Sequence, residues 1–121
     1  EWFPGRNYSF ADMVNKMSLT VAQIKELSDS GLCCIGSHTV THPRLDKLTP
    51  EEQRDEISTS KYKLEAVVGK QVDHFAFPYG CYNADTVLIV AECGYKTAVR
   101  AYGGIVRKGA ELLQINRVFL R

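Results

Sequence analysis

The chain has 121 residues, of which 45% are hydrophobic and 24% are charged, and its formal net charge is +1. This length suits one domain with a buried core. The near balance of charge gives no indication of nucleic acid or an anionic membrane surface as a partner. No apolar run approaches the roughly 20 residues that a membrane-spanning helix needs. We therefore expect a single domain over residues 1–121, without a nucleic-acid partner and without a membrane span.

Three helices are predicted from their start and stop signals, after ten initial residues that have no periodicity and are expected to form a loop. Thr20–Gln23 and Thr49–Glu52 match the capping box, in which Ser or Thr is followed three residues later by Glu or Gln. Asn83 is the expected N-cap of the third helix. Apolar residues follow at helical spacing, and a glycine suited to a left-handed C-terminal cap ends each helix: Gly31, Gly69 and Gly94.

Four apolar segments are predicted as strands: residues 32–36 (LCCIG), 73–77 (DHFAF), 95–99 (YKTAV) and 112–120 (LLQINRVFL). Cys33 and Cys34 in the first segment are expected to be small buried hydrophobic residues. No CxxC pair is present, which argues against a zinc ribbon. Strands alternating with helices predict parallel βαβ units and an α/β fold, whose functional residues follow the carboxyl ends of the strands.

The first such loop, GSHTVTHPRL at residues 36–45, contains two of the three histidines of the chain, His38 and His42. Neutral imidazole is the commonest protein ligand of zinc. Pro43 argues against a regular helix here, although a tight turn can still bring the two rings together. The alternative is that both are polar loop residues that form local hydrogen bonds. His74, inside a predicted strand, is expected to be a packed or edge residue.

The second loop, FAFPYGCYN at residues 75–83, combines two residues that constrain the backbone. Pro78 fixes one backbone angle, and Gly80 permits conformations that other residues avoid. Such a turn can direct main-chain N–H groups into a cleft, where they stabilise an oxyanion. The alternative is an ordinary turn between a strand and a helix.

Together the two loops resemble the polysaccharide deacetylases, the NodB-homology domain of carbohydrate esterase family 4. GSHTVTHPRL resembles the His-Ser/Thr-x-x-His metal motif of that family, and FAFPYG resembles its Arg-Pro-Pro-Tyr-Gly motif. The segment between the loops and GYKTAV at residues 94–99 are also similar to the family. The resemblance runs from about Leu19 to the C-terminus and implies a partial, distorted (β/α) barrel with parallel strands, similar to a TIM barrel.

The resemblance also implies an activity and roles for individual residues. The family removes N-acetyl groups from N-acetylglucosamine-type polymers, by attack of a metal-bound water. His38 and His42 would be two ligands of a divalent metal, zinc above all, in a loop held by Thr39. The backbone N–H of Tyr79 would bind the oxyanion beside Pro78. Candidates for contact with the polysaccharide are Tyr82 and Arg117, with Tyr79 and Tyr102 as further aromatic residues that could equally serve packing.

Several family features are absent from the sequence. The Thr-Phe-Asp-Asp-Gly motif, which supplies a general base and a third metal ligand, is not found. Ala76 stands where the family has an arginine, and the segment at residues 112–121 lacks the histidine of the late Leu-x-His motif. We therefore expect an N-terminally incomplete deacetylase domain, with an exposed sheet edge that a second copy could cover.

These departures leave alternatives to an active amide hydrolase. One is a catalytically inactive, carbohydrate-binding relic or a truncated fragment of such an enzyme. Another is a protein-interaction domain without metal, which would leave the two loops unexplained. The usual substrates of the family imply an extracellular or cell-envelope location, although the chain shows no signal peptide.

Overall fold

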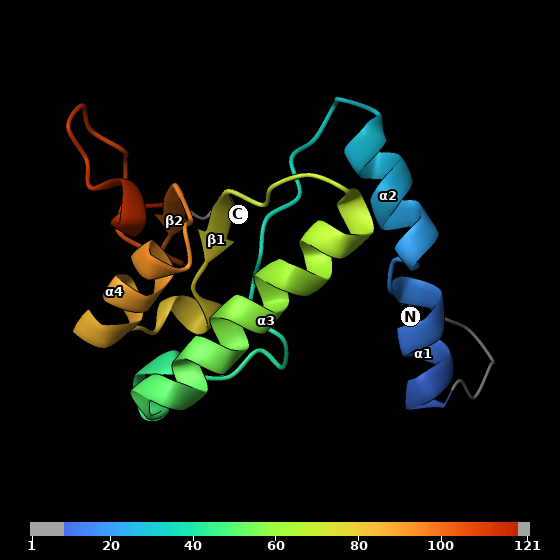
Figure 1. The fold of residues 1–121 in the computed structure, drawn as a ribbon, viewed down its shortest axis with the longest axis horizontal. Coiled ribbons are helices and arrows are strands. Elements are labelled where there is room, and N and C mark those ends of the chain that lie inside the picture. The colour runs from blue at the N-terminus through green and yellow to red at the C-terminus, as the bar shows by residue number, and fades with distance from the viewer. Residues whose placement is uncertain (1–8, 119–121) are drawn as a thin grey trace, which may run out of the picture.

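The structure is a computed structural model that describes residues 9–118, apart from four side chains in the first helix; the loop expected at the start of the chain therefore lies largely outside the described residues. This part of the chain contains four helices and two short parallel strands (Figure 1). Their order and bounds are α1 Phe10–Met17, α2 Val21–Asp29, α3 Pro50–Val68, β1 His74–Ala76, α4 Ala84–Glu92 and β2 Thr97–Val99. Helix α1 was not among the predicted helices.

The three predicted helices form where their caps indicated. In each of α2, α3 and α4, the capping side chain accepts a hydrogen bond from the backbone N–H three residues later, and that third residue bonds back to the cap. Gly69 closes α3 in the left-handed conformation, with a φ of 69°. Local capping hydrogen bonds therefore define where these helices begin.

The sheet is parallel, as predicted. Strand β1 pairs with β2, with His74 opposite Thr97 and Ala76 opposite Val99. A parallel bridge between Ser37 and Phe75 extends the sheet on one side, and a parallel bridge between Val99 and Ile115 extends it on the other. The α/β fold class is thus confirmed. Residues 9–118 form an open arc of parallel segments rather than a closed barrel.

Two predicted strands are wrong in extent. Residues 32–36 form no strand, because only the next residue, Ser37, hydrogen-bonds to β1. Cys33 and Cys34 are consequently exposed rather than buried. In the last segment, Leu112–Gln114 is a 3₁₀ turn and Ile115 alone bridges to β2, while residues 119–120 lie outside the described residues.

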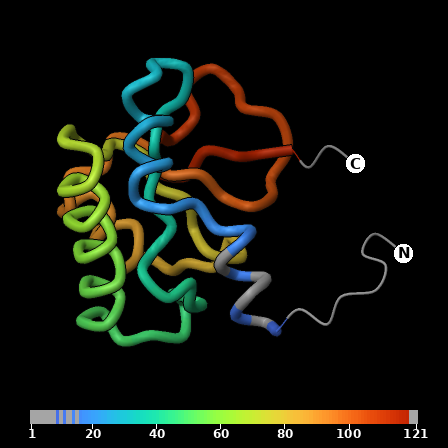
Figure 2. The backbone as a smooth tube through the Cα atoms, turned by 90° about the vertical axis from the view of Figure 1, so that its right-hand side faces the viewer, coloured from blue at the N-terminus to red at the C-terminus, as the bar shows by residue number. Residues whose placement is uncertain are grey.

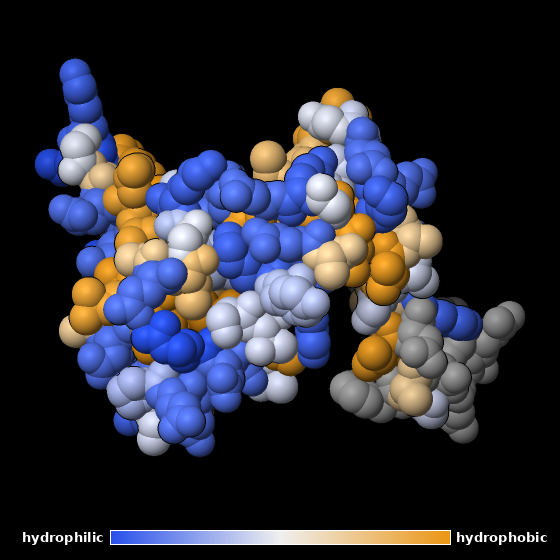
Figure 3. All heavy atoms as spheres, viewed as in Figure 1, coloured by the Kyte–Doolittle hydropathy of each residue, from blue (hydrophilic) through white to orange (hydrophobic). Residues whose placement is uncertain are grey.

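Helices α3 and α4 pack against each other, and α2 lies beside the C-terminal end of α3 (Figure 1). The core lies between these helices and the sheet. Its buried side chains come from both layers: Leu45, Ile57, Val68, Val72, Phe75, Phe77, Ile89, Val90, Tyr95 and Ala98. The outer face of α3, at the centre of Figure 3, is mainly hydrophilic. Figure 2 shows the loop after β2 on the side away from α3.

A helix that crosses a bilayer needs about 20 predominantly apolar residues. Within residues 9–118, no helix is both long enough and apolar enough to cross a membrane.

Candidate functional site

The sheet places His38 at the carboxyl end of β1. The Ser37 N–H donates to the carbonyl of His74 at 2.8 Å, and the Ala76 N–H donates to the carbonyl of Ser37 at 2.9 Å. His38 follows directly, and its Nδ1 lies 2.7 Å from the carbonyl oxygen of Ala76. Because a carbonyl only accepts, Nδ1 must carry the proton. In the neutral imidazole the lone pair is therefore on Nε2, which is the arrangement found in metal-ligating histidines.

The second histidine meets the first at this nitrogen. The Nε2 atoms of His38 and His42 are 3.1 Å apart, and the two ring centroids are 4.7 Å apart. Two nitrogens that each lie about 2.0–2.1 Å from one tetrahedral zinc ion are about 3.3 Å apart. The donor set and its spacing thus fit a shared metal ion. The alternative is a hydrogen bond between the two rings, which would bring the same two nitrogens together with one as donor and the other as acceptor.

The turn between the two histidines is strained. Thr39 and His42 have positive φ angles of 68° and 59°, which residues other than glycine rarely adopt. The Thr39 hydroxyl donates to the carbonyl of His38 at 2.5 Å and accepts from the His42 N–H at 3.1 Å. Strained backbone of this kind typically costs about 1–3 kcal/mol per residue and gathers at functional sites.

Glu56 of α3 contacts the same turn, although no local sequence pattern pointed to it. Its Oε2 accepts from the N–H groups of Val40 and Thr41, at 2.8 and 2.9 Å. Its Oε1 accepts from the Thr41 hydroxyl at 2.6 Å. Partial burial raises the pKa of Glu56, but these hydrogen bonds outweigh it and hold the pKa below its ordinary value. Glu56 is therefore expected to be a carboxylate at neutral pH.

The second loop is a tight turn that leaves one N–H without a partner. Tyr79 has a φ of 56° and a ψ of 2°, inside a 3₁₀ turn over Pro78–Gly80. The N–H groups of the next two residues, Gly80 and Cys81, donate to the carbonyls of Phe77 and Pro78. Within the described residues, the Tyr79 N–H itself has no acceptor. It is thus available to donate to an oxygen from outside the chain.

The two loops touch each other through their side chains. The ring of Tyr79 lies edge to face with the imidazole of His42, with centroids 4.6 Å apart and an angle of 65° between the planes. Tyr79 remains 60% exposed, whereas Pro78 beside it is buried. The structure therefore brings His38, His42 and Tyr79 together at the carboxyl end of the parallel sheet.

The predicted polysaccharide-contacting residues have structural partners of their own. The ring of Tyr82 stacks on Phe77 at 4.4 Å, and its hydroxyl donates to the side chain of Gln114 at 3.1 Å. The Arg117 Nε donates to the carbonyl of Arg100. The structure thus gives Tyr82 a packing contact and Arg117 a hydrogen bond within the chain, while Tyr102 is exposed.

A complete metal centre needs more ligands than this pair. Among residues 9–118, with the undescribed side chains set aside, no group of three His, Cys, Asp or Glu side chains converges. His74 faces elsewhere in the sheet, because its Nδ1 lies 2.8 Å from the Thr97 hydroxyl. A zinc site here would therefore need at least one ligand in addition to the two imidazoles of His38 and His42.

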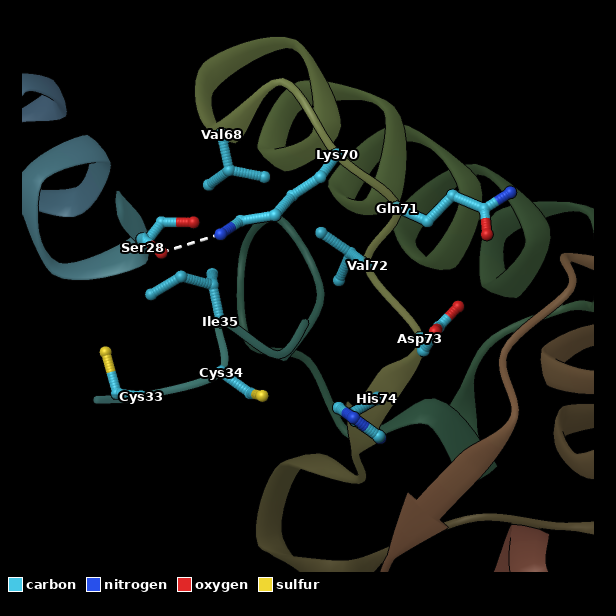
Figure 4. Close-up of a pocket in the computed structure, with 10 residues that line it drawn as sticks. All are labelled: Ser28, Cys33, Cys34, Ile35, Val68, Lys70, Gln71, Val72, Asp73 and His74. Atoms are coloured by element: carbon cyan, nitrogen blue, oxygen red, sulfur yellow. Dashed lines mark hydrogen bonds between the residues drawn. The ribbon is translucent and has the colours of Figure 1, made fainter. Parts of the chain in front are cut away.

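A separate pocket of about 130 Å³ opens at the other end of β1 (Figure 4). The pocket is lined by residues 70–74, which lead into β1, and by Cys33, Cys34 and Ile35. Lys70 reaches across it and donates to the carbonyl of Ser28 at 2.6 Å. None of the predicted site residues lines this pocket.

Comparison with known proteins identifies the family. A sequence model described as polysaccharide deacetylase matches residues 7–98, which is most of the chain. The chain belongs to the polysaccharide deacetylase family. Both loops described above lie inside the matched range.

Two named relatives support the assignment. The chain is 31% identical over 104 residues to a Bacillus subtilis (strain 168) protein named as polysaccharide deacetylase YxkH, covering 86% of this chain and 37% of the relative. It is 35% identical over 63 residues to a chitooligosaccharide deacetylase of Azorhizobium caulinodans, covering 51% of this chain and 30% of that protein.

Solved structures share the fold. The Streptococcus pyogenes deacetylase PplD, in complex with acetate, superposes with a TM-score of 0.80 at 34% identity, over 88% of this chain and 47% of that one. BA3943 of Bacillus anthracis, a CE4 family pseudoenzyme, superposes with a TM-score of 0.61 at 26% identity, over 70% of this chain and 29% of that one. The chain spans less than half the length of each of these relatives.

Proposed function

We propose that the chain forms the metal-binding and oxyanion-binding part of a polysaccharide deacetylase, which hydrolyses N-acetyl groups on N-acetylglucosamine-type polymers. The observation that carries the proposal is the convergence of the His38 and His42 Nε2 atoms, 3.1 Å apart, with the His38 tautomer fixed by Ala76. Membership of the deacetylase family supports the reaction class. The chitooligosaccharide deacetylase among the relatives supports the substrate class.

In this proposal His38 and His42 hold a divalent cation, with zinc as the first candidate because both ligands are imidazole nitrogens. When bound, such a cation supplies Lewis acidity, which polarises an amide carbonyl and acidifies water. In the neutral imidazole, the hydrogen bond from His38 Nδ1 to Ala76 leaves the lone pair on Nε2, and it fixes the plane of the ring. Thr39 holds the backbone between the two ligands.

The second loop binds the negative charge that develops on the acetyl oxygen. The free N–H of Tyr79 is the donor for this oxyanion, and the positive φ of Tyr79 sets its direction. Buried Pro78 anchors the turn beneath it. Removing one such donor typically reduces kcat by about 10²–10³-fold.

The polymer would approach over the exposed ring of Tyr79, because sugar rings stack on aromatic faces and this ring borders the histidine pair. A polymer of this class is found outside the cell, and we infer an extracellular or cell-envelope location. Contacts of Tyr82 and Arg117 with the polymer remain predictions. A second copy of the chain that covers the exposed sheet edge is likewise still a prediction.

The test measures acetate released from an N-acetylglucosamine oligomer by the zinc-loaded protein and, in parallel, zinc binding by calorimetry. A His38→Ala, His42→Ala double variant is expected to lose zinc binding and at least about a hundredfold of the activity. Unchanged turnover in this variant would contradict the metal assignment. Zinc binding by the wild type without any acetate release would instead favour the inactive, carbohydrate-binding alternative.

A further inference from the structure

The turn between the two histidines is held from outside by a single carboxylate. Glu56, on the second turn of α3, accepts hydrogen bonds from the backbone N–H groups of Val40 and Thr41 and from the Thr41 hydroxyl. All three contacts are between 2.6 and 2.9 Å. Such charge-assisted bonds are roughly twice as strong as bonds between neutral groups.

The turn depends on an external acceptor because its own backbone is unfavourable. Thr39 and His42 both have positive φ angles, and strained residues persist only where the surrounding structure holds them. Among the described residues, Glu56 is the one acceptor for the N–H groups of Val40 and Thr41. A helix in the core layer therefore fixes the middle of a strained loop at the site.

Glu56 does not itself have the freedom to do chemistry. Both of its oxygens already accept hydrogen bonds from the turn. Its contacts are with Val40 and Thr41, between the two histidines, rather than with either imidazole. Its direct contacts therefore act on the backbone of residues 39–42 and not on the metal-binding nitrogens.

We propose that Glu56 is a positioning residue that holds the turn in the conformation in which His38 and His42 converge. The effect of Glu56 on metal affinity rests on the proposed function of the histidine pair. The effect of Glu56 on the conformation of the turn is independent of that function. Residues that orient metal ligands from outside the coordination sphere typically change metal affinity by about 10–100-fold when they are removed.

The test compares Glu56→Ala and Glu56→Gln with an Asp55→Asn control. Alanine favours the helix, so α3 should keep its structure while the acceptor is lost. Glutamine keeps one acceptor oxygen and should show a smaller effect. Asp55 is the neighbouring carboxylate on α3, is exposed, and has no hydrogen bond or ion pair within the described residues. Circular dichroism and urea unfolding confirm that each variant is folded.

The first readout uses the metal-free protein. Amide hydrogen exchange at Val40 and Thr41 is expected to accelerate at least about tenfold in Glu56→Ala and to stay unchanged in Asp55→Asn. Nuclear Overhauser contacts between the His38 and His42 rings should weaken in the same variant. If exchange and ring contacts match the wild type in a folded Glu56→Ala protein, Glu56 does not hold the turn and the proposal is overturned.

The second readout is zinc affinity, measured by calorimetry on the same variants. Zinc affinity is expected to fall about 10–100-fold in Glu56→Ala and to stay within about twofold in Asp55→Asn. A loosened turn with unchanged zinc affinity would overturn the positioning role. Failure of the wild type to bind zinc would contradict the proposed metal site, while the exchange data would still decide whether Glu56 holds the turn.

Discussion

The imidazole of His42 and the phenol ring of Tyr79 meet edge to face, with their centroids 4.6 Å apart. Each residue lies in a different loop, and each has a positive φ angle. A residue with strained backbone in one loop thus contacts a residue with strained backbone in the other. Edge-to-face aromatic pairs are worth about 0.5–1.5 kcal/mol beyond the area that they bury, so this contact can help both loops keep their conformations.

Replacing Tyr79 separates the contribution of its ring from that of its hydroxyl. Tyr79→Phe keeps the ring and the backbone N–H, and should retain most of the acetate release and zinc affinity within about twofold. Tyr79→Ala removes the contact with His42 and should weaken zinc binding severalfold. A loss of several hundredfold in Tyr79→Phe would show that the phenol takes part in the chemistry, contrary to its role here.

Gly80 is predicted to be intolerant of any side chain. It has a φ of 70°, and an added Cβ would lie 2.7 Å from the Ala101 Cβ and 2.9 Å from the Ala101 N. Gly31 is a matched control, because its φ of 71° is the same within a degree and an added Cβ there meets nothing within 4 Å. Both alanine variants should lose about 1 kcal/mol from the positive φ.

Gly80→Ala should lose about 1–3 kcal/mol more than Gly31→Ala, because the second loop must move away from Ala101. Urea denaturation measures the difference. Equal losses in the two variants would mean that the contact with Ala101 is readily relieved.

The Thr39 hydroxyl is predicted to stabilise the first loop. Thr39→Val keeps the shape of the side chain but removes both hydrogen bonds, to the His38 carbonyl and from the His42 N–H. A loss of about 1–2 kcal/mol in the free energy of unfolding is expected, together with weaker zinc binding. Thr39→Ser keeps the hydroxyl and should restore most of both quantities. If the serine variant were as damaged as the valine variant, the methyl group and not the hydroxyl would be responsible.

Tyr95 makes stability sensitive to alkaline pH. Its side chain is 4% exposed and its hydroxyl donates to the carbonyl of Ile57 at 3.2 Å. Burial raises the pKa of Tyr95 from 10.0 to about 12. Because the folded pKa is the higher one, the folded chain holds the proton more tightly. This contribution to stability is complete below about pH 10 and is lost as the pH rises towards about 12.

The measurement is urea unfolding of the wild type and Tyr95→Phe between pH 8 and pH 12. The wild type should be the more stable protein at pH 8, and the difference should shrink above about pH 10. Tyr62→Phe, at an exposed tyrosine of α3, is the control and should leave the pH profile unchanged. A constant difference across this range would rule out Tyr95 as the source of the alkaline sensitivity.

Features that depend on neighbours in sequence were predicted well. The caps at Thr20, Thr49 and Asn83 and the stop at Gly69 need only a few residues of context, and all of them form. The two loops were also located, since each follows a segment that hydrogen-bonds in the parallel sheet. Local hydrogen-bond chemistry is what makes these features readable from sequence alone.

Features that depend on distant partners were not predicted. Residues 32–36 are apolar enough for a strand, but a strand needs partners, and only Ser37 finds one in β1 within the described residues. Glu56 was missed because its contacts with Val40 and Thr41 join residues 15 and 16 positions apart, with no local pattern to reveal them. The stacking of Tyr82 on Phe77 likewise appears only in three dimensions.

The bridge between Ser37 and Phe75 makes the histidine pair sensitive to the number of residues before it. Side chains alternate between the two faces of a sheet, so one residue added or removed just before His38 would turn its imidazole to the opposite face. The loop after β2 is exposed and holds neither histidine. Insertions should therefore disturb the histidine pair less at residues 103–109 than beside Ser37.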